Sequence, residues 1–277
     1  MKSIVVATDL SERSDRAMHR ALLLAKQHDI QLHVISIVDA AMPDDLARPL
    51  RLSIEERLPV QIDALNTGAS YDVTVTTGDI TEALTQFVVA KEADLVVLGL
   101  HRPRTFLDSL RETTMERIVT ASTVPVLLVK ESADHDYTSV LGLVSYSRAC
   151  ATAVDAALTL APDAAVKAIH ALHVPYAGLT GGDTDSEMAK AVRQEAEAEA
   201  AKWLETVPSE NDNFEHTIVT GGLRGIMMQT VADTKPDMLA IGAHTRSGLF
   251  LHRIGGFAAE LVREPPTDLL IAPPTGN

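Results

Sequence analysis

The chain has 277 residues, which is enough for two domains of ordinary size or for one large domain. Hydrophobic residues make up 46% of the chain and aromatic residues only 4%, so the core must be aliphatic, which suits a parallel sheet covered by helices. The formal net charge is −14, and no run of Lys or Arg interrupts it. This charge argues against binding nucleic acid or an anionic membrane through a broad basic face.

Cysteine usage and the N-terminus indicate where the protein works. Cys150 is the only cysteine, so neither an intrachain disulfide nor a cysteine-clustered zinc site can form. The opening residues enter a strand at once and lack the layout of a signal peptide. No apolar run approaches the ~18 residues that a membrane span needs. We expect a cytosolic protein that does not enter a membrane.

Short apolar runs alternate with longer amphipathic segments from the start of the chain. The expected strands are 3–9, 31–40, 71–79, 93–100 and 125–130, and the expected helices are one that begins after Ser11 and others around 53–65, 81–92 and 109–121. Ser11 is placed to cap a helix whose apolar residues share one face, namely Ala17, Met18, Ala21, Leu22 and Ala25. Five strands interleaved with four helices predict a doubly wound α/β domain.

The same series of elements then starts again. "ADLVVLG" (93–99) returns as "PDMLAIG" (236–242), an offset of 242 − 99 = 143. The opening strands fit a shorter offset, because "VVATDLSERSDRA" (5–17) matches "LGLVSYSRACATA" (141–153) at 145 − 9 = 136. The difference of seven residues requires an insertion in the second half, and the acidic helix expected at 184–207 lies where it belongs.

Two tandem copies of one domain explain this repeat better than one large domain does. We expect domains at 1–133 and 137–277, joined by the polar stretch 130–137. Each copy is expected to hold a five-stranded parallel sheet wound both ways from its first strand. The fifth strands of such sheets are exposed edges. A tandem chain can pair them internally as a pseudo-twofold dimer, so that a further homodimer would use other surfaces.

The expected topology places a ligand site where the strand order reverses, between strands 1 and 4. In the first copy these strands end at Asp9 and Gly99, and in the second at Ser145 and Gly242. A strand-end glycine followed by glycines at a helix start lets backbone N–H groups approach phosphate. A single glycine of this kind is more often a plain turn or cap.

The repeat resembles the universal stress protein domain, and the whole chain resembles the tandem members of that family. The resemblance rests on "VVATDLSERS", "LHVISIVDA", "ADLVVLG" and "PVLLV". It implies an adenine nucleotide alpha hydrolase-like fold with strand order 3-2-1-4-5, and a stress-linked role without established catalysis. It also implies ATP as the ligand, accompanied by Mg²⁺, in members that carry Gly-x2-Gly-x9-Gly before Ser or Thr and an Asp that ends strand 1.

The first copy keeps only part of that motif. Gly99, Thr113 and Asp9 match, whereas Arg102 and Glu112 replace the second and third glycines. A carboxylate about 4 Å from a phosphate charge costs roughly 1–4 kcal/mol, depending on the local dielectric. We therefore expect Arg102 and Glu112 to close this copy as a pseudo-site.

The second copy keeps the better phosphate loop. Gly242 and Gly255 match the motif, Thr245 replaces the second glycine, and Gly256 replaces the hydroxyl residue. Ser145 stands in place of the aspartate. The resemblance also implies that Ile37 and Val174, at the ends of the two second strands, line the adenine side.

These features favour a non-enzymatic binding or signalling module whose partner is a nucleotide or another phosphate-bearing small molecule. An interaction scaffold or apolar-ligand binder remains open, because the motif is damaged in both copies. A slow nucleotide hydrolase also remains open, although the chain lacks a Walker lysine. Cys150 is expected to be a core residue, and helix 184–207 a solvated face or a lid.

Overall fold

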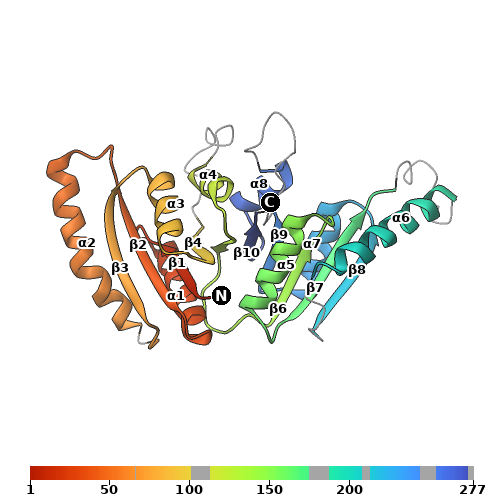
Figure 1. Cartoon of the computed structure of the whole chain (residues 1–277), viewed down its shortest axis with the longest axis horizontal. Helices are drawn as coiled ribbons and strands as arrows, with labels where there is room; N and C mark the ends of the chain where they lie inside the picture. The colour runs from red at the N-terminus through yellow and green to blue at the C-terminus, as the bar shows by residue number, and fades with distance from the viewer. Residues whose placement is uncertain (66, 101–112, 175–186, 208–212, 244–253, 274–277) are drawn as a thin grey trace. The chain divides into compact units, whose positions relative to one another are not determined.

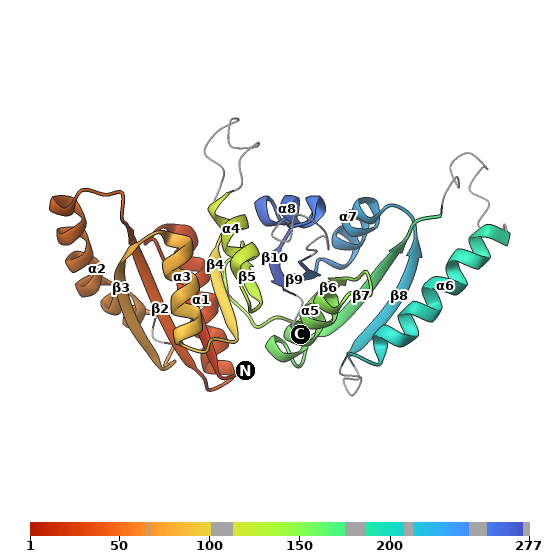
Figure 2. The same ribbon diagram turned by 45° about the horizontal axis from the view of Figure 1, so that its top comes forward.

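The computed structural model describes all residues except 66, 101–112, 175–186, 208–212, 244–253 and 274–277. The described chain forms two compact units (Figures 1 and 2). The first unit joins Met1–Asp136 to Ala243–Pro273, and the second begins at Tyr137 and ends at Gly242 within the described chain. The units reflect packing rather than the repeat, so the domain bounds 1–133 and 137–277 stay a prediction.

The first unit is a doubly wound α/β sheet. Its elements are β1 (Ser3–Ala7), α1 (Glu12–Gln27), β2 (Gln31–Asp39), α2 (Asp44–Ala64), β3 (Tyr71–Gly78), α3 (Ile80–Ala90), β4 (Leu95–Gly99), α4 (Thr114–Ala121), β5 (Val126–Val129), α8 (Gly256–Arg263) and β10 (Asp268–Ala272). The strand order is β3-β2-β1-β4-β5-β10, with β1–β5 parallel and β10 antiparallel to β5. This order confirms the predicted winding of the first copy, and the two fifth strands pair with each other.

Local sequence signals explain how α1 starts. The Ser11 side chain caps the helix by accepting a hydrogen bond from the backbone N–H of Ser14, at 3.4 Å. The five apolar residues predicted to share a face are all buried. The cap and the stripe therefore fix both the start of α1 and the face that it turns to the sheet.

Helix α2 starts about nine residues earlier than the sequence predicts. It begins at Asp44 rather than near residue 53, and it contains Pro49 and Pro59. A proline removes one backbone hydrogen bond from a helix interior and normally ends the helix. The buried residues of α2 share one stripe that spans both prolines, and they are Ala47, Ile54, Leu58 and Ile62. Burial of this stripe outweighs the local breakers.

The second unit repeats the arrangement. Its elements are β6 (Ser139–Leu143), α5 (Arg148–Leu160), β7 (Ala165–Leu172), α6 (Glu187–Leu204), β8 (Phe214–Thr220), α7 (Leu223–Thr234) and β9 (Met238–Gly242). All its strands are parallel, in the order β8-β7-β6-β9. The ladders of the two units superimpose in register, because Ala7↔Ile35 in the first corresponds to Leu143↔Ile169 in the second.

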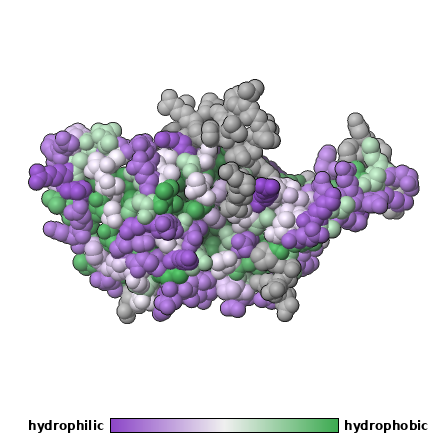
Figure 3. All heavy atoms as spheres, viewed as in Figure 1, coloured by the Kyte–Doolittle hydropathy of each residue, from purple (hydrophilic) through white to green (hydrophobic). Residues whose placement is uncertain are grey.

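The register also locates the insertion. The second strands are offset by 169 − 35 = 134 residues, whereas the third strands are offset by 216 − 73 = 143. Nine extra residues therefore lie between β7 and β8, the interval that contains α6. This helix presents mostly hydrophilic side chains (Figure 3) and packs through Ala189, Ala196, Ala200 and Trp203.

Candidate functional site

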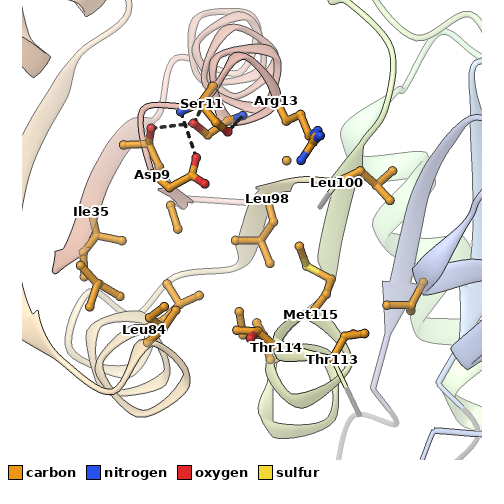
Figure 4. A pocket seen from close by; sticks show the side chains of 18 of the residues that line it. Asp9, Ser11, Arg13, Ile35, Leu84, Leu98, Leu100, Thr113, Thr114 and Met115 are labelled. Atoms are coloured by element: carbon orange, nitrogen blue, oxygen red, sulfur yellow. Dashed lines mark hydrogen bonds between the residues drawn. The ribbon is translucent and has the colours of Figure 1, made fainter. Parts of the chain in front are cut away.

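A cavity of about 360 Å³ lies in the first unit where the strand order reverses between β1 and β4. Its lining comes from the ends of β1, β2 and β4 and from the starts of α1, α3 and α4, and α8 adds two residues. Figure 4 shows Asp9 and Arg13 at one wall and Thr113 and Met115 at the opposite wall. The volume lies within the range of about 300–1,000 Å³ that small-molecule sites occupy.

Most of the cavity wall is apolar. The large aliphatic side chains that line it are Ile35, Ile37, Ile80, Leu84, Leu98, Leu100, Met115, Ile118 and Val262. Ile35 and Ile37 point to the same side of β2 because alternate residues of a strand share a face. A wall of this kind accepts a flat, weakly polar group such as a nucleobase, or an alkyl chain.

Asp9 is the single carboxylate among the described lining residues. Its Oδ1 accepts a hydrogen bond from the Ser11 backbone N–H at 3.0 Å. Burial raises the pKa of Asp9, but hydrogen bonds from Ser11 and Ser14 outweigh this effect, so its pKa lies below the ordinary value. Asp9 is therefore ionised at neutral pH and can accept hydrogen bonds from ligand hydroxyl groups.

The strand-end glycines have a packing role that the sequence alone does not reveal. A Cβ atom on Gly99 would lie 2.4 Å from the Arg13 carbonyl oxygen, and one on Gly242 would lie 2.6 Å from the Cys150 backbone nitrogen. Arg13 and Ala149 match at the repeat offset of 136, as do Ser14 and Cys150. Each glycine thus lets the first turn of the first helix of its copy, α1 or α5, pack directly against the fourth strand of that copy.

The first backbone N–H groups of α4 are capped by side chains at the start of the same helix. The Thr113 hydroxyl accepts from the Glu116 backbone N–H at 3.2 Å, and Glu116 Oε2 accepts from the Thr113 backbone N–H at 2.7 Å. Glu116 is almost fully buried and also pairs with Arg263, whose Nη2 lies 3.0 Å from Oε1. The amide of Thr113 is therefore already satisfied, and a phosphate would have to displace Glu116 to use it.

The structure brings together the four predicted site residues of the first copy, Asp9, Ile37, Gly99 and Thr113, around this cavity. Arg102 and Glu112, the pair expected to close it, lie outside the described residues. Ligand binding here is not tested by the structure and stays a prediction.

The predicted site residues of the second copy belong to different units of the structure. Gly242 ends β9 in the second unit, whereas Gly255 caps α8 and Gly256 begins it in the first unit. Thr245 lies outside the described residues. The register makes Ala171 of the second copy equivalent to Ile37 of the first (37 + 134 = 171). Val174 lies beyond the end of β7 and is therefore not the counterpart of Ile37.

The cavity fits part of the ligand that the resemblance implies. Ile35, Ile37 and Leu84 would contact the adenine of ATP, and Asp9 would accept from its ribose. Mg²⁺ would have Asp9 alone as a carboxylate ligand among the described lining residues. No group of three or more His, Cys, Asp or Glu side chains in the described parts of the chain could hold a metal ion.

A second feature is an aromatic cluster in the second unit, whose members the sequence alone does not bring together. Tyr146 stacks on His170 with ring centroids 4.3 Å apart, and its hydroxyl lies 3.2 Å from His216 Nε2. Trp203 packs beside them and donates a hydrogen bond from its indole N–H to the Ser147 carbonyl at 3.2 Å. Tyr146 and Trp203 line a groove between α5 and α6. The first copy has Leu10, Ser36 and Val73 at the positions of Tyr146, His170 and His216.

Two further expectations concern single residues and membrane insertion. Cys150 is only 1% exposed, which confirms it as a core residue. Among the described residues, no helix combines the length and apolar character needed to traverse a bilayer.

Comparison with known proteins supports the repeat. The model of the universal stress protein family matches residues 1–130 and again 136–273. A curated Thermus aquaticus protein, named "Universal stress protein in QAH/OAS sulfhydrylase 3'region", is 27% identical over 136 residues, which cover 47% of this chain and 98% of that protein.

Two solved structures span nearly the whole chain. A universal stress protein from Archaeoglobus fulgidus has a TM-score of 0.71 at 16% identity, over 99% of this chain and 98% of that one. A functionally unknown protein from Pseudomonas aeruginosa has a TM-score of 0.66 at 19% identity, over 99% and 93% respectively. At this level of identity the two structures support the fold alone.

Proposed function

The chain belongs to the universal stress protein family, and we propose that it is a non-enzymatic stress-response module that binds an adenine nucleotide or a related small molecule. The observation that carries the proposal is the cavity at the β1/β4 reversal, with its apolar wall and with Asp9 as the single ionised carboxylate among its described lining residues. The wall suits the base and Asp9 suits the ribose hydroxyls. The same cavity offers no second carboxylate for metal-assisted hydrolysis among its described residues.

The test is ligand binding by the intact chain with a matched pair of variants. Adenosine, AMP and ATP are titrated by calorimetry and by thermal shift, because a ligand that binds only the folded state raises its stability. Asp9→Asn keeps an acceptor for the Ser11 amide but loses the charge, so affinity for adenosine should fall about tenfold or more. Asp155→Asn, which changes an exposed aspartate of α5, is the control. Equal affinities for the two variants, or no thermal shift at millimolar nucleotide, would contradict the proposal.

Gly255 and Gly256, at the start of α8, are proposed as a second phosphate site, and the sequence favours this site over the first. Gly255→Glu should abolish the second of two binding events and leave the first. ATP hydrolysis no faster than in buffer is the expected result for a module without catalysis. Mass spectrometry of small molecules released from protein purified without added ligand would identify the natural occupant.

A second candidate function is binding of an apolar or amphipathic molecule in the same cavity. It is favoured by nine large apolar side chains among the described residues that line the wall. A fluorescent naphthalene sulfonate probe separates the two functions. Displacement by decanoate but not by adenosine supports the apolar ligand, and the opposite order supports the nucleotide.

A further inference from the structure

Strand β3 forms an edge of the first unit's sheet, because it pairs with β2 and with no other described strand (Figure 1). Tyr71–Gly78 pair with β2 in one unbroken register. Every residue of β3 is at least partly exposed, whereas β1 and β4 are buried along most of their length. A terminal strand of this kind can pair with a strand from another chain.

The register shows which backbone groups of β3 face outward. The Leu32 N–H donates to the Ser70 carbonyl at 3.0 Å and the Ala40 N–H to the Gly78 carbonyl at 3.2 Å, so the even-numbered residues bond to β2. The backbone groups of successive residues point to opposite sides of a strand. The residues that turn their N–H and C=O groups to the free edge are therefore Tyr71, Val73, Val75 and Thr77. In the described chain, none of these backbone groups has a hydrogen-bond partner.

The sequence of β3, "YDVTVTTG", lacks the usual devices that protect a sheet edge. It contains no lysine and no proline, and its register with β2 has no bulge. Asp72 is its single charged residue, and this carboxylate lies 2.6 Å from His33 Nδ1 and 3.2 Å from Lys91 Nζ. The edge therefore offers unpaired donors and acceptors without an unbalanced charge that would repel an added strand.

A groove of about 350 Å³ lies beside this edge, between β3 and α3. Thr74 and Thr76 line it from β3, and within the described chain their hydroxyl groups have no hydrogen-bond partner. Glu82 lines it from α3; its Oε1 accepts a hydrogen bond from the Gln86 side chain at 3.1 Å, but among the described residues no cation pairs with it. Every second side chain of an added strand would point to the α3 side of the sheet, where this groove lies.

We propose that the β3 edge binds an extended segment of another protein by strand addition, and that this segment carries lysine or arginine at the positions that point toward α3. The backbone of the segment would bond to the free edge, and its basic side chains would reach Glu82 and the threonine hydroxyls. A second copy of this chain fits less well, because each chain has a net charge of −14 and the two edges would bring like charges together. This inference does not depend on the function proposed above.

The experiment uses the intact chain and short fluorescent peptides in which valine alternates with either lysine or glutamate. The lysine peptide should bind at least about tenfold more tightly than the glutamate peptide in fluorescence anisotropy, and Glu82→Gln should weaken it several-fold. A lysine peptide with N-methylated valines has the same charge but cannot donate to an edge strand. It is the control for non-specific attraction and should bind at least about tenfold more weakly.

A matched pair of variants tests the backbone of β3. Thr77 is exposed, and its N–H faces the free edge, so Thr77→Pro removes an outward donor without breaking a bond to β2. It should lower the affinity for the lysine peptide about tenfold. Thr77→Val keeps the N–H and should stay within about twofold of the wild type. Circular dichroism checks that both variants fold.

Hydrogen exchange followed by NMR gives a second readout that does not require a variant. The lysine peptide should slow exchange of the Val73 and Val75 amides and leave the Thr74 amide, which already bonds to β2, unchanged. The proposal is overturned if the lysine peptide does not bind, if its N-methylated form binds equally well, or if binding leaves the Val73 and Val75 amides unprotected. A wild-type chain that sediments as a dimer and a Thr77→Pro chain that sediments as a monomer would assign the edge to a second copy and overturn the basic partner.

Discussion

Replacing Gly99 by alanine tests whether the strand-end glycine serves packing. The added Cβ would lie 2.4 Å from the Arg13 carbonyl oxygen, 2.6 Å from its carbonyl carbon and 2.8 Å from the Ser14 nitrogen. All three contacts are with backbone atoms, so no side-chain rotation can relieve them. The first turn of α1 would have to move away from β4, and overpacking of this kind costs about 1–3 kcal/mol.

A loss of this size lowers the melting temperature by roughly 2–12 °C for a domain of this class, at about 2–4 °C per kcal/mol. The assay is urea and thermal denaturation followed by circular dichroism. Gly225→Ala is the matched control, because it makes the same change in helix α7, where nothing lies within 4 Å of the added Cβ. It should be stabilising by about 0.5–1 kcal/mol.

The reasoning is refuted if Gly99→Ala melts at the wild-type temperature. A variant that keeps its stability but loses nucleotide binding would instead show that the glycine is there to admit a ligand. Gly242→Ala repeats the test in the second copy, where the added Cβ would lie 2.6 Å from the Cys150 nitrogen.

Three further predictions follow from buried groups. Asp268 is 1% exposed, accepts hydrogen bonds from the Lys130 and Glu131 amides at 2.8 and 3.0 Å, and lies 3.8 Å from Arg20 Nε. Asp268→Asn leaves Arg20 buried without its counter-charge, so the free energy of unfolding measured by urea denaturation should fall by about 3–5 kcal/mol. Burial and the nearby His170 lower the pKa of His216 below 6.5 in the folded chain, so the unfolded chain binds a proton at this histidine more readily. The stability of the fold should therefore be full above pH 6.5 and decrease as the pH falls through the lower pKa of the folded state. In a series of thermal melts from about pH 8 to pH 5, His216→Asn should flatten this decrease. Cys150, at 1% exposure, should react with a thiol reagent in urea far faster than in the native protein, and equal rates would show that the helix start opens easily.

The sequence predicts the sheet well because each strand of a parallel sheet is a short apolar run between breakers, and such runs are visible without any tertiary information. The repeat adds a second copy of the same signal. Helix α2 was harder to predict, because Pro49 argues locally against a helix, and the burial of the stripe Ala47, Ile54, Leu58 and Ile62 that overrides it is a tertiary effect.

The candidate site was predictable only in part. Asp9 and Gly99 could be identified because they follow or end strands at a known reversal of strand order, and Thr113 because the resemblance to the universal stress protein motif implies it. Arg263 could not, because an arginine in the last turn of a helix is ordinary in sequence and its contact with Glu116 spans 147 residues. The sequence also does not distinguish a glycine that admits a helix backbone from one that admits a phosphate.

The turn after the first strand shows what the two copies retain. Leu10 and Tyr146 occupy the same place at an offset of 136, and both have a left-handed backbone, with φ of 60° and 58°. Neither is a glycine, so the surrounding packing must hold a conformation that L-residues normally avoid. The left-handed backbone is kept although the side chain changes from Leu to Tyr. The conformation is therefore a property of the turn, which sets the direction of the helix that follows, and not of the particular residue. The turn and the strand-end glycine therefore form one structural unit in each copy, on which the first copy builds an apolar cavity and the second an aromatic cluster with two histidines.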